Sequence, residues 1–211
     1  MNRRLAVLIS GRGSNLQSII DAIGTGSLEA TIVVVVSNRS DAAGLLRARE
    51  ARIEALCLDP RDYPDRTAYD RAIVDVLTAR NIGLVCLAGF MRLVRAPLLE
   101  AFPNAILNIH PSLLPAFPGV DAQLQALTHG VKVAGATVHL VTGELDNGPI
   151  VAQSSVPVLD DDTRDTLAAR ILIEEHKLYP DAIRTVLDGG WRVEGRRFRL
   201  TRAGEDSPSE G

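Results

Sequence analysis

Residues 5–23 read LAVLISGRGSNLQSIIDAI, and the pattern within this stretch decides the fold. Its first five residues are a continuous apolar run, which is typical of a β-strand buried on both faces. A glycine-rich turn follows, and from Leu16 to Ile23 apolar residues recur at the spacing of one helix face. The stretch therefore predicts a strand, a tight turn and a helix, the first part of a β-α-β unit.

The same alternation continues along the chain. Residues 31–36 and 84–88 are further apolar runs rich in branched side chains, and residues 69–77 between them have helical spacing. Residues 105–109 predict another inner strand, which leads into a proline-rich stretch at 110–118 that we expect to be a rigid loop. These runs predict a single-domain, Rossmann-like α/β fold with a mostly parallel central sheet and helices on both faces.

The pattern changes after the proline-rich loop. Two β-rich runs, residues 131–141 and 149–158, predict antiparallel strands that close the C-terminal side of the sheet. Thr163 is expected to cap a long helix that ends near Leu187.

The end of the chain is predicted in three parts. Residues 1–190 form the main domain, residues 191–201 form a hairpin packed on it, and the polar residues 202–211 form a disordered tail.

The composition excludes several classes of protein. The 211 residues are 46% hydrophobic and 23% charged, which is typical of one globular domain. Basic and acidic residues are mixed along the chain with a net charge of −3, so we expect no nucleic-acid surface. No apolar run approaches the roughly 20 residues that cross a membrane. Cys57 and Cys86 fit neither a disulfide framework nor a CxxC pair, which favours the reducing cytoplasm.

The glycine-rich turn has two interpretations. The amides of Gly13, Ser14 and Asn15 could bind a phosphate at the start of the first helix. Alternatively, Ser14 caps that helix and Gln17 completes a capping box. A dinucleotide fits poorly because Leu16 replaces the third glycine of the usual G-x-G-x-x-G pattern.

A second candidate site follows the strand at residues 105–109. Asn108 and His110 are two positions apart, so their side chains point to the same side of a strand. An amide that donates to an oxyanion and an imidazole that exchanges protons suit attack on an acyl carbon. Asp146 could sustain the charged imidazole if folding brings it near, or it could simply form a turn.

Glu175 interrupts the apolar stripe of the long helix. A buried carboxylate is costly unless it is paired. Its partner could be a neighbouring arginine or the ammonium group of a ligand, and the sequence leaves both open.

Four motifs together resemble the phosphoribosylglycinamide formyltransferases, folate-dependent enzymes of purine synthesis. The motifs are SGRGSNL at 10–16, AGFMR at 88–92, NIHPSLLP at 108–115 and ELDNGP at 144–149. The resemblance implies the formyltransferase fold and transfer of a formyl group to the amine of 5′-phosphoribosylglycinamide (GAR). It implies 10-formyltetrahydrofolate as the cosubstrate and no metal.

The resemblance also implies a role for particular residues. The implied catalytic residues are Asn108, His110 and Asp146. The implied GAR-binding residues are Gly13, Ser14, Asn15 and Glu175. The implied folate-binding residues are Arg66, Met91, Arg92, Leu93, Val94, Asn108, Thr142 and Asp146. The expected partners are these two small molecules, without nucleic acid or membrane, for a cytoplasmic monomer or weak homodimer.

One segment departs from the resemblance. Relatives carry a Thr-His pair shortly after the sequence FPG at 117–119, whereas this chain has Asp121, Ala122 and Gln123 there. Any role of that pair at the folate side is therefore open in this chain.

Three other functions compete with formyl transfer to GAR. Hydrolysis of the same folate would use the same three catalytic residues, but in the family it comes with an added N-terminal domain. The tRNA formyltransferase carries a C-terminal domain for which we expect no room here. A non-catalytic phosphosugar-binding protein would have no use for Asn108, His110 and Asp146.

Overall fold

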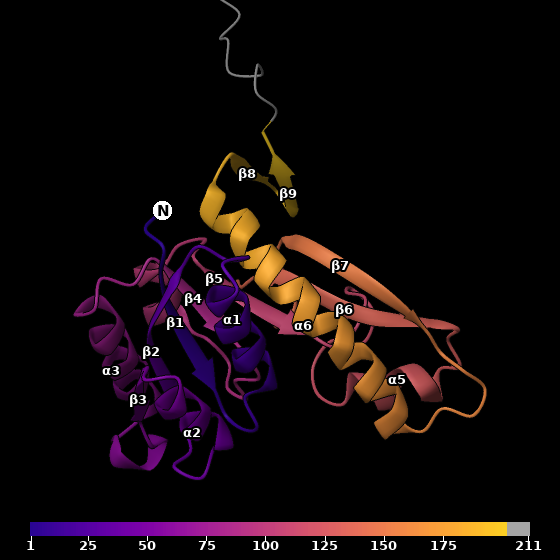
Figure 1. Cartoon of the computed structure of the whole chain (residues 1–211), viewed down its shortest axis with the longest axis horizontal. Helices are drawn as coiled ribbons and strands as arrows, with labels where there is room; N and C mark the ends of the chain where they lie inside the picture. Colours follow the sequence, from indigo (N-terminus) through magenta and orange to yellow (C-terminus); the bar gives the residue numbers. More distant parts are fainter. Residues whose placement is uncertain (202–211) are drawn as a thin grey trace, which may run out of the picture.

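The computed structural model describes residues 1–201 as one sheet with helices on both faces (Figure 1). The predicted tail at 202–211 lies outside the described residues. In chain order the elements are β1 (Arg4–Ile9), α1 (Ser14–Gly24), β2 (Thr31–Ser37), α2 (Ala43–Glu50), β3 (Glu54–Cys57), the 3-10 helix η1 (Pro60–Asp62), α3 (Arg66–Thr78), β4 (Leu84–Leu87), α4 (Ala96–Ala101), β5 (Ile106–His110), α5 (Ala122–Thr128), β6 (Val133–Leu140), β7 (Ile150–Pro157), α6 (Arg164–Asp188), β8 (Trp191–Glu194) and β9 (Arg197–Leu200).

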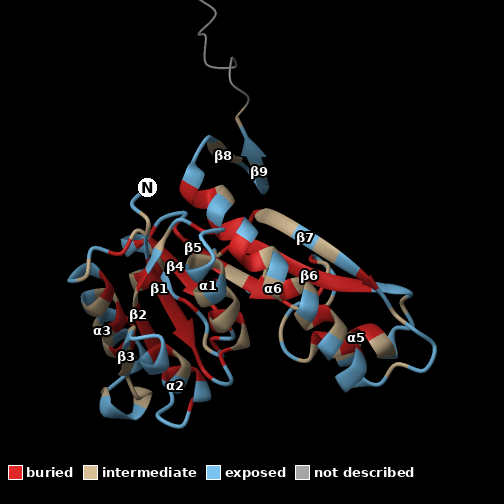
Figure 2. Cartoon of the chain, in the orientation of Figure 1, coloured by how far each residue is buried: buried red, intermediate tan, exposed pale blue. Residues whose placement is uncertain are grey.

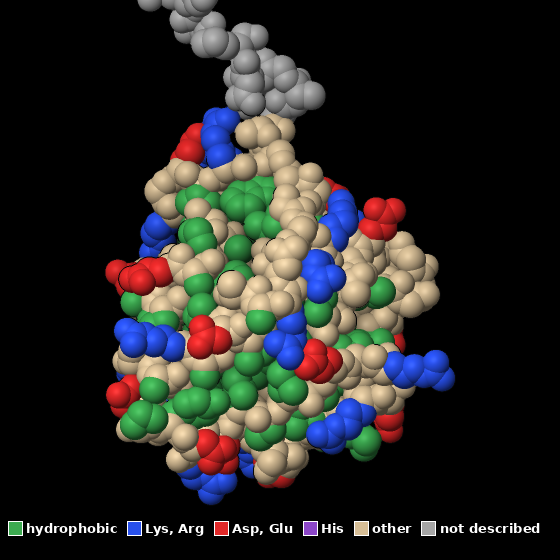
Figure 3. Space-filling view, turned by 90° about the vertical axis from the view of Figure 1, so that its left-hand side faces the viewer, with side chains coloured by type: hydrophobic (Ala, Val, Ile, Leu, Met, Phe, Trp, Pro, Cys, Tyr) green, Lys and Arg blue, Asp and Glu red, His purple; other side chains and the backbone are tan. Residues whose placement is uncertain are grey.

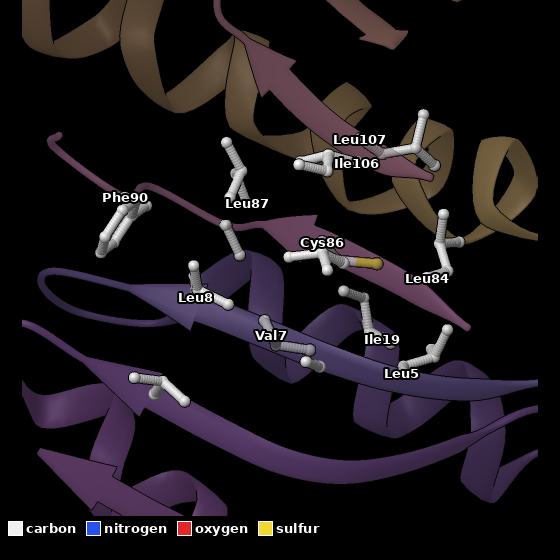
Figure 4. Packing of buried hydrophobic residues seen from close by; sticks show 14 of the residues in the cluster. Leu5, Val7, Leu8, Ile19, Leu84, Cys86, Leu87, Phe90, Ile106 and Leu107 are labelled. Carbon is white, nitrogen blue, oxygen red and sulfur yellow. The ribbon is translucent and has the colours of Figure 1, made fainter. Parts of the chain in front are cut away.

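The five N-terminal strands are parallel, as predicted, and the sheet order is β3-β2-β1-β4-β5-β6-β7-β9-β8. β1 and β4 are buried along almost their whole length because helices cover both faces (Figure 2). Their apolar side chains, among them Val7, Leu8 and Leu87, pack side by side with Ile106 of β5 in the core (Figure 4). The burial explains why these strands are continuous apolar runs rather than alternating ones.

The strand order reverses at β1, which lies between β2 and β4. Right-handed crossovers then require α3 and α4 to lie on the face opposite α1 and α2. The connections that follow the paired carboxyl ends of β1 and β4 lead to helices on opposite faces, and open α/β sheets bind ligands at such a switch point. The sheet therefore places the glycine-rich turn at the expected position for a site.

Antiparallel strands follow β5 on the C-terminal side of the sheet, as predicted. β6 pairs with β5 and β7 in antiparallel register, whereas β9 joins β7 through a single parallel pair, Ile150 with Arg197. The predicted hairpin is present as β8 and β9, and the Trp191 indole N–H donates to the carbonyl of Val186 (2.9 Å). The hairpin thus continues the sheet beyond the end of α6.

The long helix α6 begins as predicted. The Thr163 hydroxyl accepts a hydrogen bond from the Thr166 amide (3.2 Å), and the Thr166 hydroxyl accepts one from the Thr163 amide (2.9 Å). Near its other end, the buried Tyr179 hydroxyl lies 3.0 Å from the carbonyl of Leu87 and 3.1 Å from that of Leu107. One hydroxyl therefore links α6 to β4 and β5.

Substitution of Tyr179 by phenylalanine is expected to lower the free energy of unfolding by about 1–2 kcal/mol, because a buried donor is lost. Urea unfolding with an unchanged m-value would measure the difference. Tyr63→Phe is the matched control, since the Tyr63 hydroxyl has no hydrogen bond among residues 1–201. Equal stability of the two variants would contradict the bridging role of Tyr179.

The face shown in Figure 3 mixes charges of both signs. Lysine and arginine side chains alternate there with acidic ones, and hydrophobic groups lie between them. This face presents no continuous basic surface, in keeping with the composition. Within residues 1–201, no helix is long and apolar enough to span a bilayer.

Candidate active site

The glycine-rich turn does not form the capping box that was one of its two interpretations. Gly13, not Ser14, is the N-cap of α1, and no side chain caps the helix, so the predicted capping box is wrong. Gln17 instead donates to Asp21 (2.8 Å). Gly13 has φ 72°, and a Cβ there would come within 2.6 Å of the Cα of Gly44, so a side chain does not fit. The first amides of α1 are left without a side-chain acceptor, which suits an anion.

Ser10 ties this turn to two neighbouring loops. Its amide donates to the carbonyl of Gly89 (3.1 Å), and its hydroxyl donates to the side-chain oxygen of Asn38 (2.6 Å). The same hydroxyl accepts a hydrogen bond from the amide of Met91 (2.8 Å). The loops that follow β1, β2 and β4 are thus fixed relative to one another at the switch point.

Glu175 lies beneath the turn and is 7% exposed. Asn15 Nδ2 donates to its Oε2 at 2.6 Å, so its partner in the protein is an amide and not the arginine considered from sequence. Burial raises the pKa of Glu175, and the hydrogen bond from Asn15 opposes that effect. The pair joins the glycine-rich turn to α6.

Asn108, His110 and Asp146 come together. His110 Nδ1 lies 3.4 Å from Asp146 Oδ2, and Asn108 Nδ2 lies 3.5 Å from Asp146 Oδ1. Asn108 and His110 share one side of β5 because they are two residues apart, while Asp146 comes from the connection between β6 and β7. The contact between the turn and the strand, which the sequence left open, is therefore present.

The hydrogen bonds of His110 assign its ring nitrogens. Nε2 lies 2.9 Å from the carbonyl oxygen of Phe117, which can only accept, so Nε2 carries a proton. Nδ1 is then the nitrogen that gains or loses a proton, and it faces the Asp146 carboxylate. The arrangement presents one defined proton-exchange atom next to a negative charge.

His139 was missed by the sequence analysis. It lies directly opposite Asn108 in the pairing of β5 and β6. Its Nδ1 faces the carbonyl of Leu140 (3.0 Å), and its Nε2 lies 3.2 Å from Asn108 Nδ2 and 3.7 Å from Asp146 Oδ1. A histidine in an otherwise apolar strand was the signal that could have revealed it.

Asp146 is 9% exposed at its side chain, yet it favours the charged form. Burial by itself would raise its pKa, but the ring of His139, the amide of Gly119 (2.8 Å from Oδ2) and the ring of His110 together lower it. The carboxylate is therefore negative at neutral pH in a nearly closed environment.

Two small cavities adjoin these residues. The first, of about 90 Å³, includes Asn108, His139, Thr142 and Asp146 in its wall, and His110 lies behind Asp146. Its remaining walls are Leu87, Phe90, Arg92, Leu93, Val94, Val141, Gly143, Glu144 and Leu145.

The second cavity, of about 230 Å³, shares Arg92 and Leu93 with the first and is completed by Arg66, Asp70, Met91 and Arg95. The folate residues implied by the resemblance thus divide between two adjoining cavities.

The second cavity has an excess of positive charge. Arg66, Arg92 and Arg95 form no ion pair with other residues of the described chain, and Arg92 lies 4.8 Å from the ring centre of Tyr69. Burial raises the pKa of Asp70, and the three arginines oppose that effect. Asp70 and Arg95 were not singled out from the sequence.

A wider hollow of about 660 Å³ lies between α1 and α6 and touches the turn through Ser14. None of Asn108, His110 and Asp146 lines it, so this hollow is separate from the cluster of those three residues. Within residues 1–201, no group of His, Cys, Asp and Glu side chains is arranged to hold a metal ion.

Comparisons with known proteins identify one group of relatives. The model of the formyl transferase family matches residues 3–183 of this chain. A phosphoribosylglycinamide formyltransferase of Escherichia coli K12 is 44% identical over 207 residues, which is 98% of this chain and 97% of that protein. A trifunctional purine biosynthetic protein adenosine-3 of Bos taurus is 44% identical over 203 residues. The chain spans 96% of its own length in that match but 20% of the bovine protein.

A solved structure gives the same result. Glycinamide ribonucleotide transformylase 1 from Symbiobacterium toebii has a TM-score of 0.94 and 57% identity to this chain, with 95% of each chain covered. The resemblance seen in the four motifs therefore extends over nearly the whole sequence and fold.

Proposed function

Because this chain belongs to the formyl transferase family, we propose that it transfers the formyl group of 10-formyltetrahydrofolate to the amine of GAR. The products are formyl-GAR and tetrahydrofolate, in purine synthesis. One observation carries the proposal: Asp146 contacts both Asn108 and His110, beside a cavity that adjoins the loop after β4. The relatives named above support GAR as the acceptor.

GAR is assigned to the switch point of the sheet. Its phosphate accepts hydrogen bonds from the amides of Gly13, Ser14 and Asn15, which open α1 without a capping side chain. Its amino end reaches Glu175, which Asn15 already contacts (2.6 Å). The two ends of the acceptor are thus bound by parts of one hydrogen-bonded unit.

The folate is assigned to the two adjoining cavities. Its reacting end lies with Val94, Thr142 and Asp146 around the first cavity. The carboxylates of its glutamate tail extend toward Arg66 and Arg92 of the second, whose positive charge has no ion-pair partner in the described chain. The residues shared by the cavities make this a continuous path.

The proposed reaction is direct acyl transfer. The amine nitrogen of GAR attacks the formyl carbon, a C–N bond forms, and the carbonyl oxygen becomes an oxyanion. Asn108 Nδ2 turns the hydrogen that faces Asp146 Oδ1 (3.5 Å) toward this oxygen and donates to it, and His110 Nδ1 takes the amine proton. Collapse breaks the bond to N10 of the folate, which receives a proton in turn. Asp146 stabilises the charged imidazole between these steps.

The test is formyl transfer measured with both substrates and with each omitted. Product formation that needs GAR supports a transferase. Folate consumption at the same rate without GAR would instead indicate the hydrolase. We propose that GAR and 10-formyltetrahydrofolate are the only partners, without nucleic acid or membrane. We also propose that the protein works in the cytoplasm as a monomer or weak homodimer.

Substitution of Glu175 by glutamine is expected to raise KM for GAR about tenfold or more, because a charged hydrogen-bond acceptor for the amino end is lost at nearly constant volume. Steady-state kinetics at saturating folate would measure the change.

Glu174→Gln is the matched control for that experiment. Glu174 is the neighbouring carboxylate, but it bonds Ser154 (2.8 Å) and Lys177 (2.7 Å) away from the turn. The same rise in KM for both variants would rule out a specific role of Glu175.

A further inference from the structure

The segment between β5 and α5 has an unusual backbone. Phe117, Gly119 and Asp121 have φ values of 54°, 80° and 59°, all in the left-handed region. Two of these residues are not glycine, so the segment is held against its intrinsic preference by its contacts. The hydrogen bonds of this segment show which neighbours hold it in this conformation.

The backbone of this segment touches the proposed catalytic residues directly. The Phe117 carbonyl accepts the hydrogen bond from His110 Nε2 (2.9 Å). The Gly119 amide donates to Asp146 Oδ2 (2.8 Å). The first contact fixes which nitrogen of His110 exchanges protons, and the second orients the carboxylate that faces it.

Gln125 of α5 fixes the same segment from the other side. Its Nε2 donates to the carbonyls of Pro118 (3.2 Å) and Val120 (2.9 Å). The peptide between residues 118 and 119 is therefore held at both ends, with its C=O bound to Gln125 and its N–H bound to Asp146. Rotation of this planar group would break both hydrogen bonds together.

The ion pair of Asp121 and Arg164 is a second anchor (2.6 Å), but its side chains are 35% and 58% exposed. Exposed pairs of this kind contribute little. The two hydrogen bonds of Gln125 act on the peptide that contacts Asp146, whereas the ion pair acts two residues further along.

We infer that Gln125 is a positioning residue for formyl transfer, which acts through the peptide of residues 118 and 119 on Asp146 and through Phe117 on His110. The inference rests on the proposed function. Gln125 lines neither of the two cavities nor the hollow beside the glycine-rich turn, so its loss is expected to affect the chemical step rather than binding.

The test compares Gln125→Glu with Gln123→Glu. Glutamate keeps the size of the side chain but cannot donate to the two carbonyls. Gln123 lies on the same helix and makes no hydrogen bond within residues 1–201. Gln125→Glu is expected to lower kcat about tenfold with both KM values within about twofold of wild type, while Gln123→Glu changes neither.

The pH profile separates positioning from a general loss of stability. The titratable groups that face Asp146 are His110 and His139, and the variants leave both in place. Loss of the ordered Gly119 amide removes a hydrogen bond that favours the charged carboxylate, so the acidic limb of kcat is expected to move to higher pH. Gln125→Lys keeps N–H donors and is expected to recover most of kcat.

Three outcomes would count against the inference. Equal kcat for Gln125→Glu and Gln123→Glu overturns it, as does a fall in kcat that leaves the pH profile unmoved and is not rescued by lysine. A wild-type protein that transfers no formyl group defeats the proposed function and this inference together. Thermal midpoints of all variants identify any that fail to fold, and Gln125→Met, which also removes the donor at similar size, then replaces Gln125→Glu in the comparison.

Discussion

Replacement of His110 by alanine is expected to lower kcat by about 10³-fold, because the group that takes the amine proton in the transition state is lost. GAR binding is expected to survive, since the glycine-rich turn and Glu175 do not contact His110. Steady-state assays give kcat, and calorimetric titration gives the affinity of the variant for GAR. The pair of measurements separates the chemical step from binding.

The His110 experiment has a clear contrary outcome. Turnover within about threefold of wild type would remove His110 from the chemistry, because general acid-base catalysis contributes at least about 10²-fold where it operates. Loss of GAR binding together with turnover would indicate a damaged fold, which an unfolding curve detects.

Asp146→Asn is expected to lower kcat by about 10²-fold or more, since the imidazolium of His110 then forms without a facing negative charge. Despite burial, the His139 and His110 rings and the Gly119 amide lower the pKa of Asp146. Wild-type activity that depends on this carboxylate is therefore retained above the ordinary aspartate pKa and lost as the pH falls through the lowered value. The variant has no carboxylate at any pH, so that part of its profile disappears.

The pH dependence of the free energy of unfolding is a second test of the charge on Asp146. A lowered pKa in the folded state adds stability that is fully present above the ordinary aspartate value, about 3.9, and is lost as pH falls through the folded value. Unfolding of wild type and Asp146→Asn should therefore differ most near neutral pH and converge in acid.

Asp161→Asn is the matched control for both measurements, because Asp161 is exposed and its side chain forms no ion pair or hydrogen bond within residues 1–201. An identical pH profile for Asp146→Asn and wild type would tell against coupling to His110.

Much of the fold could be predicted from the sequence because burial on both faces leaves a strong pattern. The inner strands around Val7 and Leu87 are apolar throughout, and the α6 stripe has a clear period. β3 was not predicted, since it is an edge strand whose residues are half-buried or exposed, with Cys57 among the exposed ones. The short helices α2, α4 and α5 span too few turns to show a period.

The residues of the candidate site were predictable where a side chain acts and not where the backbone acts. Asn108, His110 and Glu175 were singled out because polar side chains interrupt ordered apolar patterns. Asp146 lies in a turn-forming sequence, and the resemblance to the formyltransferases implied its role. Phe117 and Gly119 act through backbone atoms, which every residue carries, so no residue type could mark them. Their role depends on a loop conformation that only the folded chain defines.

The hydroxyl of Tyr179 has a consequence for the accuracy of the reaction. Tyr179 lies one helical turn after Glu175, and one of its two partners is the carbonyl of Leu107, the neighbour of Asn108. In the proposed reaction, the rigid interior therefore holds the position of the amine at a fixed distance from the position of the oxyanion. A misplacement of about 1 Å between reacting atoms can cost about 10²-fold in rate. In the proposed reaction, the packing of the interior around Tyr179 therefore sets how precisely the amine approaches the formyl carbon.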